Sequence, residues 1–291
     1  MLREHQLRWG VDQWAAYLSG QVFPCMPRSK AMLTALEEAE GEALAARELA
    51  DIAGTDPFLC LRLLREAEAH RTRRLGHDTT TPLAAVMLLG SDTFRELLVS
   101  SPETDEGNPG LVRCEARAHL AARLARQWGT ARSDVSPDEV AMAALLEEIG
   151  ELLLWTFAPD LPAAAEAELA SGRAQRSVQA QVQVCGFAFR QLTLKCAIIW
   201  NLPPLLVQLI RGVDNVRANL SRLCVDTARH LVSGPENPAL PSDLVEAKRL
   251  IPSASLRWLV EHMPGIDAEH AEALVAATEP LLGAAENPSA D

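Results

Sequence analysis

Three carboxylates in one strongly apolar segment have the residue types and the spacing to do chemistry. Glu147 and Glu148 are adjacent, and Glu151 follows Glu147 by one helical turn. Carboxylate oxygens of this kind can hold a hard divalent cation. Acids on an exposed helix are more commonly just solvated. A solvated helix face is therefore the favoured interpretation, with Glu148 beside the apolar side and partly buried, and an all-carboxylate metal site is the alternative.

The histidines and cysteines indicate no second chemical site. Several histidines have no second ligand at i+3 or i+4: His70, His77, His119 and His230. The six cysteines form no C-x-x-C pair, which indicates buried free thiols rather than a zinc site or a disulfide framework. A G-x-S-x-G elbow and a phosphate-cradling glycine-rich loop are also missing from the sequence. We expect no catalytic residue, no metal and no cofactor.

A cationic segment is the remaining candidate site. It contains Arg62, Arg65, Arg71, Arg73 and Arg74. Cations near the C-terminus of a helix are favourable in any case, so a solvated helix end is the favoured interpretation. The alternative is an anion or nucleotide site, in which the planar guanidinium groups hold a phosphate.

The composition indicates that helices position these residues. Hydrophobic residues make up 48% of the 291 residues and aromatic residues only 4%, and Ala and Leu dominate. Since β-branched residues are sparse, helix is favoured over sheet. The chain is long enough for one large domain or two smaller ones. We expect an all-α fold, a two-lobed bundle of many helices.

Local signals place the individual helices. Asp56 as a cap and Pro57 at the first helical position predict a helix over 57–70. Gly90 ends a predicted helix over 82–89, and the next one runs to about Val99. Further helices are expected at 9–18, from 29 onward, and at 113–128, 187–200, 203–212 and 215–232. The tail after Ala284 is expected to fray.

The strongest helix signal begins at Ser136. Ser136 and Glu139 match a capping box, with Pro137 at the first helical position. Apolar residues then repeat on one helical face, at Met142, Leu145, Leu146, Ile149, Leu152 and Leu153. This pattern predicts one helix that carries all three carboxylates.

The segment Ser101 to Gly110 breaks the helical pattern. It combines prolines, glycines and an asparagine with acidic residues. Such a composition is typical of an exposed loop. We therefore expect the boundary between the two lobes here.

The net charge of −12 argues against a general nucleic-acid binder, because phosphate contacts require a basic surface. Met1 to Trp14 lacks the apolar core of a signal peptide, and no stretch has the apolar length of a membrane span. We expect a cytoplasmic protein without a membrane partner.

Three segments of the first half, in order, resemble HDOD domains. Phe23 to Pro27 (F-P-C-M-P) is similar to the family's opening L-P-x-L-P turn. Leu49 to Arg65 resembles its L-A-x-x-I-x-x-D-P-x-L-x-x-R-L-L-R helix pair. Ala85 to Leu97 resembles the A-I-x-x-L-G-x-x-x-L-R-x-L signature that follows.

The resemblance continues in the second half. Ala144 to Leu153 is similar to the family's L-L-H-D-I-G-K-L-L, and Trp200 to Pro203 to its W-G-L-P. The resemblance covers roughly residues 23–233. It implies four parts, which are an N-terminal helical extension (1–22), an HDOD N-terminal lobe (23–104), an HD-like lobe with a degenerate metal site (105–233) and a C-terminal helical segment (234–291).

The departures from the family pattern concern the metal site of the catalytic HD relatives. Those enzymes hold a water-activating metal with a first His, an adjacent His-Asp pair and a later Asp. Here Glu147 and Glu148 replace the pair, Arg113 replaces the upstream His, and Arg211 to Asp214 stands where relatives often show histidines. We expect Arg113 to pair with Glu148, so that Arg113, Glu147, Glu148 and Glu151 form an ion-pair site.

The resemblance implies a non-catalytic bacterial signalling module that binds a protein partner or a nucleotide-like ligand. The alternative is a metal-dependent HD-type phosphohydrolase that acts on nucleotides or cyclic dinucleotides with unusual ligands. The aromatic side chains of Trp9, Trp14 and Tyr17 form a further candidate surface. We expect it to cover the core, and a docking surface is the alternative.

Overall fold

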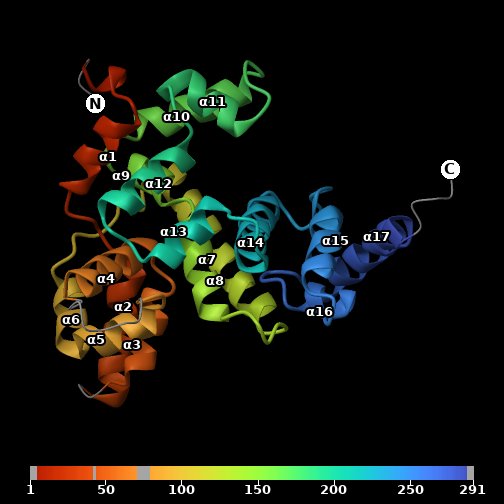
Figure 1. Cartoon of the computed structure of the whole chain (residues 1–291), viewed down its shortest axis with the longest axis horizontal. Helices are drawn as coiled ribbons and strands as arrows, with labels where there is room; N and C mark the ends of the chain where they lie inside the picture. The colour runs from red at the N-terminus through yellow and green to blue at the C-terminus, as the bar shows by residue number, and fades with distance from the viewer. Residues whose placement is uncertain (1–4, 42–43, 71–78, 287–291) are drawn as a thin grey trace. The chain divides into compact units, whose positions relative to one another are not determined.

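Helices build the part of the chain that the structure, a computed structural model, describes: residues 5–41, 44–70 and 79–286 (Figure 1). Within these ranges, strand-like pairing is limited to an isolated bridge between Cys25 and Glu103. The predicted all-α class is confirmed. No single helix in the described ranges is long and apolar enough to cross a bilayer. The helices α11 (Ser177–Cys185) and α12 (Phe189–Ile199), bent by 71° at their break, reach that length and composition only when taken together.

The chain divides into two compact units, each made from separate stretches of sequence. Unit 1 comprises Met1–Glu115 and Leu145–Val207, and unit 2 comprises Ala116–Ala144 and Gln208–Asp291. Compact units follow contacts in space, whereas the four parts expected from the sequence follow chain order. Those four ranges therefore stay a prediction.

Most of the helices belong to one unit. Unit 1 contains the 3-10 turn Gln6–Arg8, α1 Val11–Ser19, α2 Pro27–Glu40, α3 Ala46–Ala53, α4 Pro57–His70, α5 Pro82–Leu89, α6 Ser91–Val99, α9 Ile149–Phe157, α10 Asp160–Ala170, α11 Ser177–Cys185 and α12 Phe189–Ile199. Unit 2 contains α14 Val216–Val232, α15 Leu240–Leu250, α16 Leu256–Glu261 and α17 Ala268–Glu286. Residues of both units occur in α7 Pro109–Gly129, α8 Pro137–Leu146 and α13 Pro204–Arg211.

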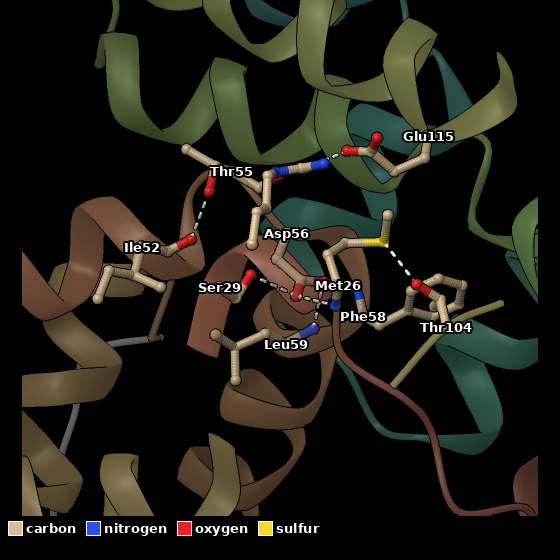
Figure 2. Close-up of polar contacts among 10 residues, drawn as sticks. Met26, Ser29, Ile52, Thr55, Asp56, Phe58, Leu59, Thr104 and Glu115 are labelled. Carbon is tan, nitrogen blue, oxygen red and sulfur yellow. Dashed lines mark hydrogen bonds and ion pairs between the residues drawn. The ribbon is translucent and has the colours of Figure 1, made fainter. Parts of the chain in front are cut away.

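The carboxylate of Asp56 connects α4 to α2, and its side chain is fully buried. One oxygen accepts hydrogen bonds from the amides of Phe58 (2.9 Å) and Leu59 (3.0 Å), which confirms the predicted helix cap. The other oxygen accepts from the Met26 amide (2.7 Å) and the Ser29 hydroxyl (2.8 Å). Figure 2 shows these donors converging on the carboxylate. One side chain thus caps α4 and holds the first turn of α2.

Arg28 adds a second connection beside Asp56. Its guanidinium donates to the carbonyl of Thr55 and to the carboxylate of Glu115. Glu115 lies in α7 and is only 5% exposed, so this ion pair is partly desolvated. Within unit 1 it ties the start of α2 to the first half of α7.

The segment 101–110 is largely the exposed loop that its composition predicts, since most of residues 102–109 are exposed and α7 begins only at Pro109. The Cys25 amide donates to Pro102 (2.8 Å), and the Thr104 amide donates back to the Cys25 carbonyl (3.0 Å). Ser101 and Thr104 are buried. The last two residues of the segment already belong to α7. The sequence did not predict the pairing with Cys25, which satisfies these backbone groups inside unit 1.

Helix α1 covers the core of unit 1 through Trp14 and Leu18, both almost completely buried. It packs against α12, and Asp12 pairs with Lys195 at 2.6 Å. The ring of Trp9 lies 5.0 Å from that of Trp14. The aromatic face therefore has the core-covering position that we expected.

Unit 2 has its own apolar core, in which α15 packs against α14, α16 and α17. Trp128 at the end of α7 is fully buried, and its indole Nε1 donates to the carbonyl of Leu259 (3.0 Å). This bond joins α7 to α16 within the unit. The tail expected to fray after Ala284 lies, beyond Glu286, outside the described residues.

Replacing Asp56 by Asn is expected to lower the free energy of unfolding by about 2–3 kcal/mol, because an acceptor oxygen becomes an NH2 donor facing other donors. Ser29→Ala is the matched control, since it removes one donor and leaves the three amide bonds. It is expected to cost about 1 kcal/mol or less. Urea unfolding followed by circular dichroism measures both. Equal losses would contradict a central role for the carboxylate.

Candidate functional site

Glu147 and Glu148 lie in a break between two helices, not within one. α8 ends at Leu146 and α9 begins at Ile149, whereas the apolar pattern predicts a single helix. The Thr193 hydroxyl of α12 donates to the Glu147 carbonyl (3.1 Å) and accepts from the Gly150 amide (3.0 Å). The single-helix prediction was wrong because a side chain from α12 replaces the missing helical hydrogen bonds.

Gly150 allows this approach of α12 to α9. A Cβ atom at this position would lie 2.8 Å from the carbonyl oxygen of Phe189 and 2.8 Å from the amide nitrogen of Thr193. Backbone atoms cannot move away as the end of a flexible side chain can. Gly150 is therefore required by packing, although alanine is normally preferred in a helix.

The three candidate carboxylates have separate surroundings. Glu147 is only 10% exposed at its side chain, and its Oε1 lies 3.8 Å from Nε of Arg190. Glu148 is also buried, and the Oε1 of Glu151 accepts from the Trp155 indole (3.4 Å). The predicted solvated face is thus wrong for Glu147, whereas the burial expected of Glu148 is confirmed. Across the described ranges, no group of three or more His, Cys, Asp or Glu side chains is arranged to hold a metal ion.

Arg113 has a different partner from the one predicted. It donates to both carboxylate oxygens of Glu166, at 2.7 and 3.0 Å, and so connects α7 to α10. Both side chains are nearly half exposed. The predicted pairing with Glu148 is therefore wrong. Sequence reasoning missed Glu166 because α10 carries no family motif.

The cationic segment is only partly described. Arg71, Arg73 and Arg74 lie outside the described residues, whereas Arg62 and Arg65 lie on α4 and are half-buried. The predicted solvated helix end is therefore wrong for these two. Their surroundings bring together several segments that are distant in the sequence.

We call this place the motif junction, defined by Phe23, Arg62, Arg65, Ser101 and Trp200. Arg62 donates to the Phe23 carbonyl (3.4 Å) and to the Ser101 hydroxyl. The Arg65 guanidinium lies 5.0 Å from the ring centre of Phe23 and 5.4 Å from that of Trp200. Three of the segments that carry the resemblance therefore meet on α4. The sequence did not single out Ser101, which lies in the segment 101–110.

Burial controls the electrostatics of the motif junction. It lowers the pKa of both guanidinium groups, and the charge of Arg62 lowers that of Arg65 further. Burial also raises the pKa of the nearby Cys25 thiol to about 11 and that of Cys196 to about 12. These thiols stay protonated at neutral pH, which makes them poor nucleophiles. The junction therefore offers cationic groups that can bind an anion, but no reactive thiolate.

Gly150→Ala is expected to destabilise unit 1 by about 1–3 kcal/mol, because the added methyl group would overlap the α12 backbone. The matched control is Gly283→Ala in α17, where a Cβ would meet nothing within 4 Å. That change is expected to be neutral or stabilising by up to about 1 kcal/mol. Thermal unfolding compares the variants. A Gly150→Ala protein as stable as the control would exclude close packing at the break.

Comparisons with known proteins identify similar sequences and folds. The sequence model of the HDOD domain matches residues 26–216. A structure of the MmoQ response regulator from Methylococcus capsulatus str. Bath is 21% identical, with a TM-score of 0.61 over 80% of this chain and 98% of that chain. A virulence factor from Campylobacter jejuni subsp. jejuni is 15% identical, with a TM-score of 0.68 over 91% and 97% of the two chains. No curated protein sequence matches this chain.

The HDOD match covers more than half of the chain. The match begins at Met26, whose amide donates to Asp56, and it includes α4, the break at Glu147 and the Trp200 segment. The two similar structures share the fold over most of both chains. The chain belongs to the HDOD domain family.

Proposed function

We propose that this chain is a non-catalytic HDOD module that regulates by binding a protein partner or a small ligand. The proposal is carried by what occupies the position of the catalytic His-Asp pair. Two glutamates, Glu147 and Glu148, stand there in the break between α8 and α9, and both are nearly buried. An arginine lies within ion-pair distance of the first.

Arg190 supplies a positive charge beside Glu147, which stands where the resemblance places the His of the metal-binding pair. A desolvated carboxylate is costly without a counter-charge, and the guanidinium of Arg190 meets that need at Glu147. A divalent cation would have to compete with it for the same oxygens. Hydrolytic transition metals also favour imidazole ligands, and the sequence contains no histidine between residues 120 and 229.

The family and one similar structure support a regulatory role. The MmoQ protein, whose fold this chain shares, is described as a response regulator, which is a class of signalling protein. A signalling module acts by binding and releasing its partners, and this requires no set of catalytic residues. The motif junction supplies one surface for such binding.

The proposal predicts that the full-length protein does not hydrolyse phosphoesters. With Mg2+ or Mn2+ present, the rates on bis-p-nitrophenyl phosphate, nucleotides and cyclic dinucleotides are expected to equal the rate without protein. Wild type and the Glu147→Gln, Glu148→Gln double variant are compared in the same assay. Bound metal measured by mass spectrometry is expected to be well below one ion per chain.

The control for this assay is Glu261→Gln, which removes an exposed carboxylate from α16. A wild-type rate above background that persists in this control but is lost in the double variant would show an all-carboxylate hydrolase. It would replace the proposed function with the enzyme alternative.

A further inference from the structure

The motif junction contains two positive charges that form no ion pair with a described carboxylate. Burial lowers the pKa of both guanidinium groups by more than the charge of Glu66 raises it. Across the described residues, neither Arg62 nor Arg65 has an ion-pair partner within 4 Å, although most arginines of unit 1 pair with an acid. Glu66, which follows Arg65 in the sequence, has a carboxylate oxygen 3.2 Å from His70 instead. The junction therefore has a net positive charge inside a chain whose net charge is −12.

The hydrogen-bonding capacity of the two guanidinium groups is also mostly unused by the described residues. A guanidinium has five N–H donors. Arg62 uses one terminal nitrogen for both Phe23 and Ser101, which leaves its other terminal nitrogen and its Nε without a described acceptor. The described contacts of Arg65 are the two aromatic faces, which accept no conventional hydrogen bond.

The surroundings hold these donors in place. Phe23 and Trp200 are 1% and 6% exposed, and their rings lie 5.3 Å apart with Arg65 over both. Stacking on two fixed rings restricts the plane of the guanidinium, so less side-chain entropy is lost when a ligand binds. Arg62 and Arg65 are neighbours at i,i+3, where like charges repel unless an anion lies between them.

We propose that Arg62 and Arg65 form a binding site for the phosphate group of a ligand. The inference rests on the proposed binding function and names the chemistry of its ligand. Two guanidinium groups match the double negative charge of a phosphate better than the single charge of a carboxylate, and their planar edges suit paired hydrogen bonds to its oxygens. Because both aromatic rings are buried, the remainder of the ligand does not stack on them.

The test titrates the full-length protein with inorganic phosphate at constant ionic strength, with chloride as the balancing anion. Calorimetry and thermal shift are expected to show saturable binding and a rise in Tm. Arg65→Gln is expected to weaken binding about tenfold or more, because charged hydrogen bonds are lost. Arg47→Gln is the matched control, since Arg47 is an exposed arginine of unit 1 on α3. It is expected to bind like wild type.

A second measurement needs no variant, so it holds even where Arg65→Gln does not fold. Phenylglyoxal labels accessible arginines, and peptide mapping reports the extent at each position. Phosphate is expected to protect Arg62 and Arg65 and to leave Arg47 unprotected. No saturable effect of phosphate beyond that of chloride, equal binding by Arg65→Gln, or equal protection of Arg47 would each overturn the proposed site.

A parallel titration with a nucleoside monophosphate distinguishes a nucleotide ligand from free phosphate. The nucleotide binds more tightly than inorganic phosphate only if the site serves nucleotides. Failure of this inference and failure of the proposed function are distinguishable. Hydrolysis that depends on Glu147 and Glu148 would remove the proposed function alone. A lack of phosphate binding, with no hydrolysis, would remove the site alone.

Discussion

The buried carboxylate of Asp56 is the interaction on which the site-bearing part of unit 1 depends. Burial raises the pKa of this carboxyl group, and the amide hydrogen bonds from Leu59 and Met26 oppose that rise. With Phe58 and Ser29 included, four donors offset the cost of removing the side chain from water. The same bonds set the start of α4, and α4 then carries both arginines of the motif junction.

Local sequence signals predicted those helices and caps that depend on interactions between residues close together in the sequence. The cap of α4 was visible because Asp56 bonds to amides two and three residues later. The helices near residues 82–89, 187–200 and 215–232 follow from their own periodicity and ends, and the structure places them within about two residues. The bonds from Asp56 to Met26 and Ser29 were not predictable, because they join positions 27 and 30 residues apart.

The wrong predictions share one physical cause, which is a partner far away in the sequence. Apolar periodicity continues through Glu147 and Glu148, so only Thr193, more than 40 residues later, reveals that the helix breaks there. The pairing of Pro102 and Thr104 with Cys25 was likewise not predictable, because the two segments lie far apart in the sequence. The same distinction between local and long-range signals applies to the candidate site. Its residue types were visible in the sequence, but the pairing of Arg113 with Glu166 was not.

The two candidate sites differ in how their charges are compensated, and this difference supports the proposed ligand site. At Glu147 a desolvated negative charge already has a guanidinium within 4 Å, so no added cation is needed to offset its burial. At Arg62 and Arg65 two half-buried positive charges have hydroxyl, carbonyl and aromatic contacts but no ion pair with a described acid. Desolvation makes an uncompensated charge costly, and an anionic ligand is what lowers that cost. The charge of Glu147 thus has a guanidinium nearby within the chain, while the guanidinium groups on α4 have no ion-pair partner among the described residues, and the proposed phosphate site rests on this difference.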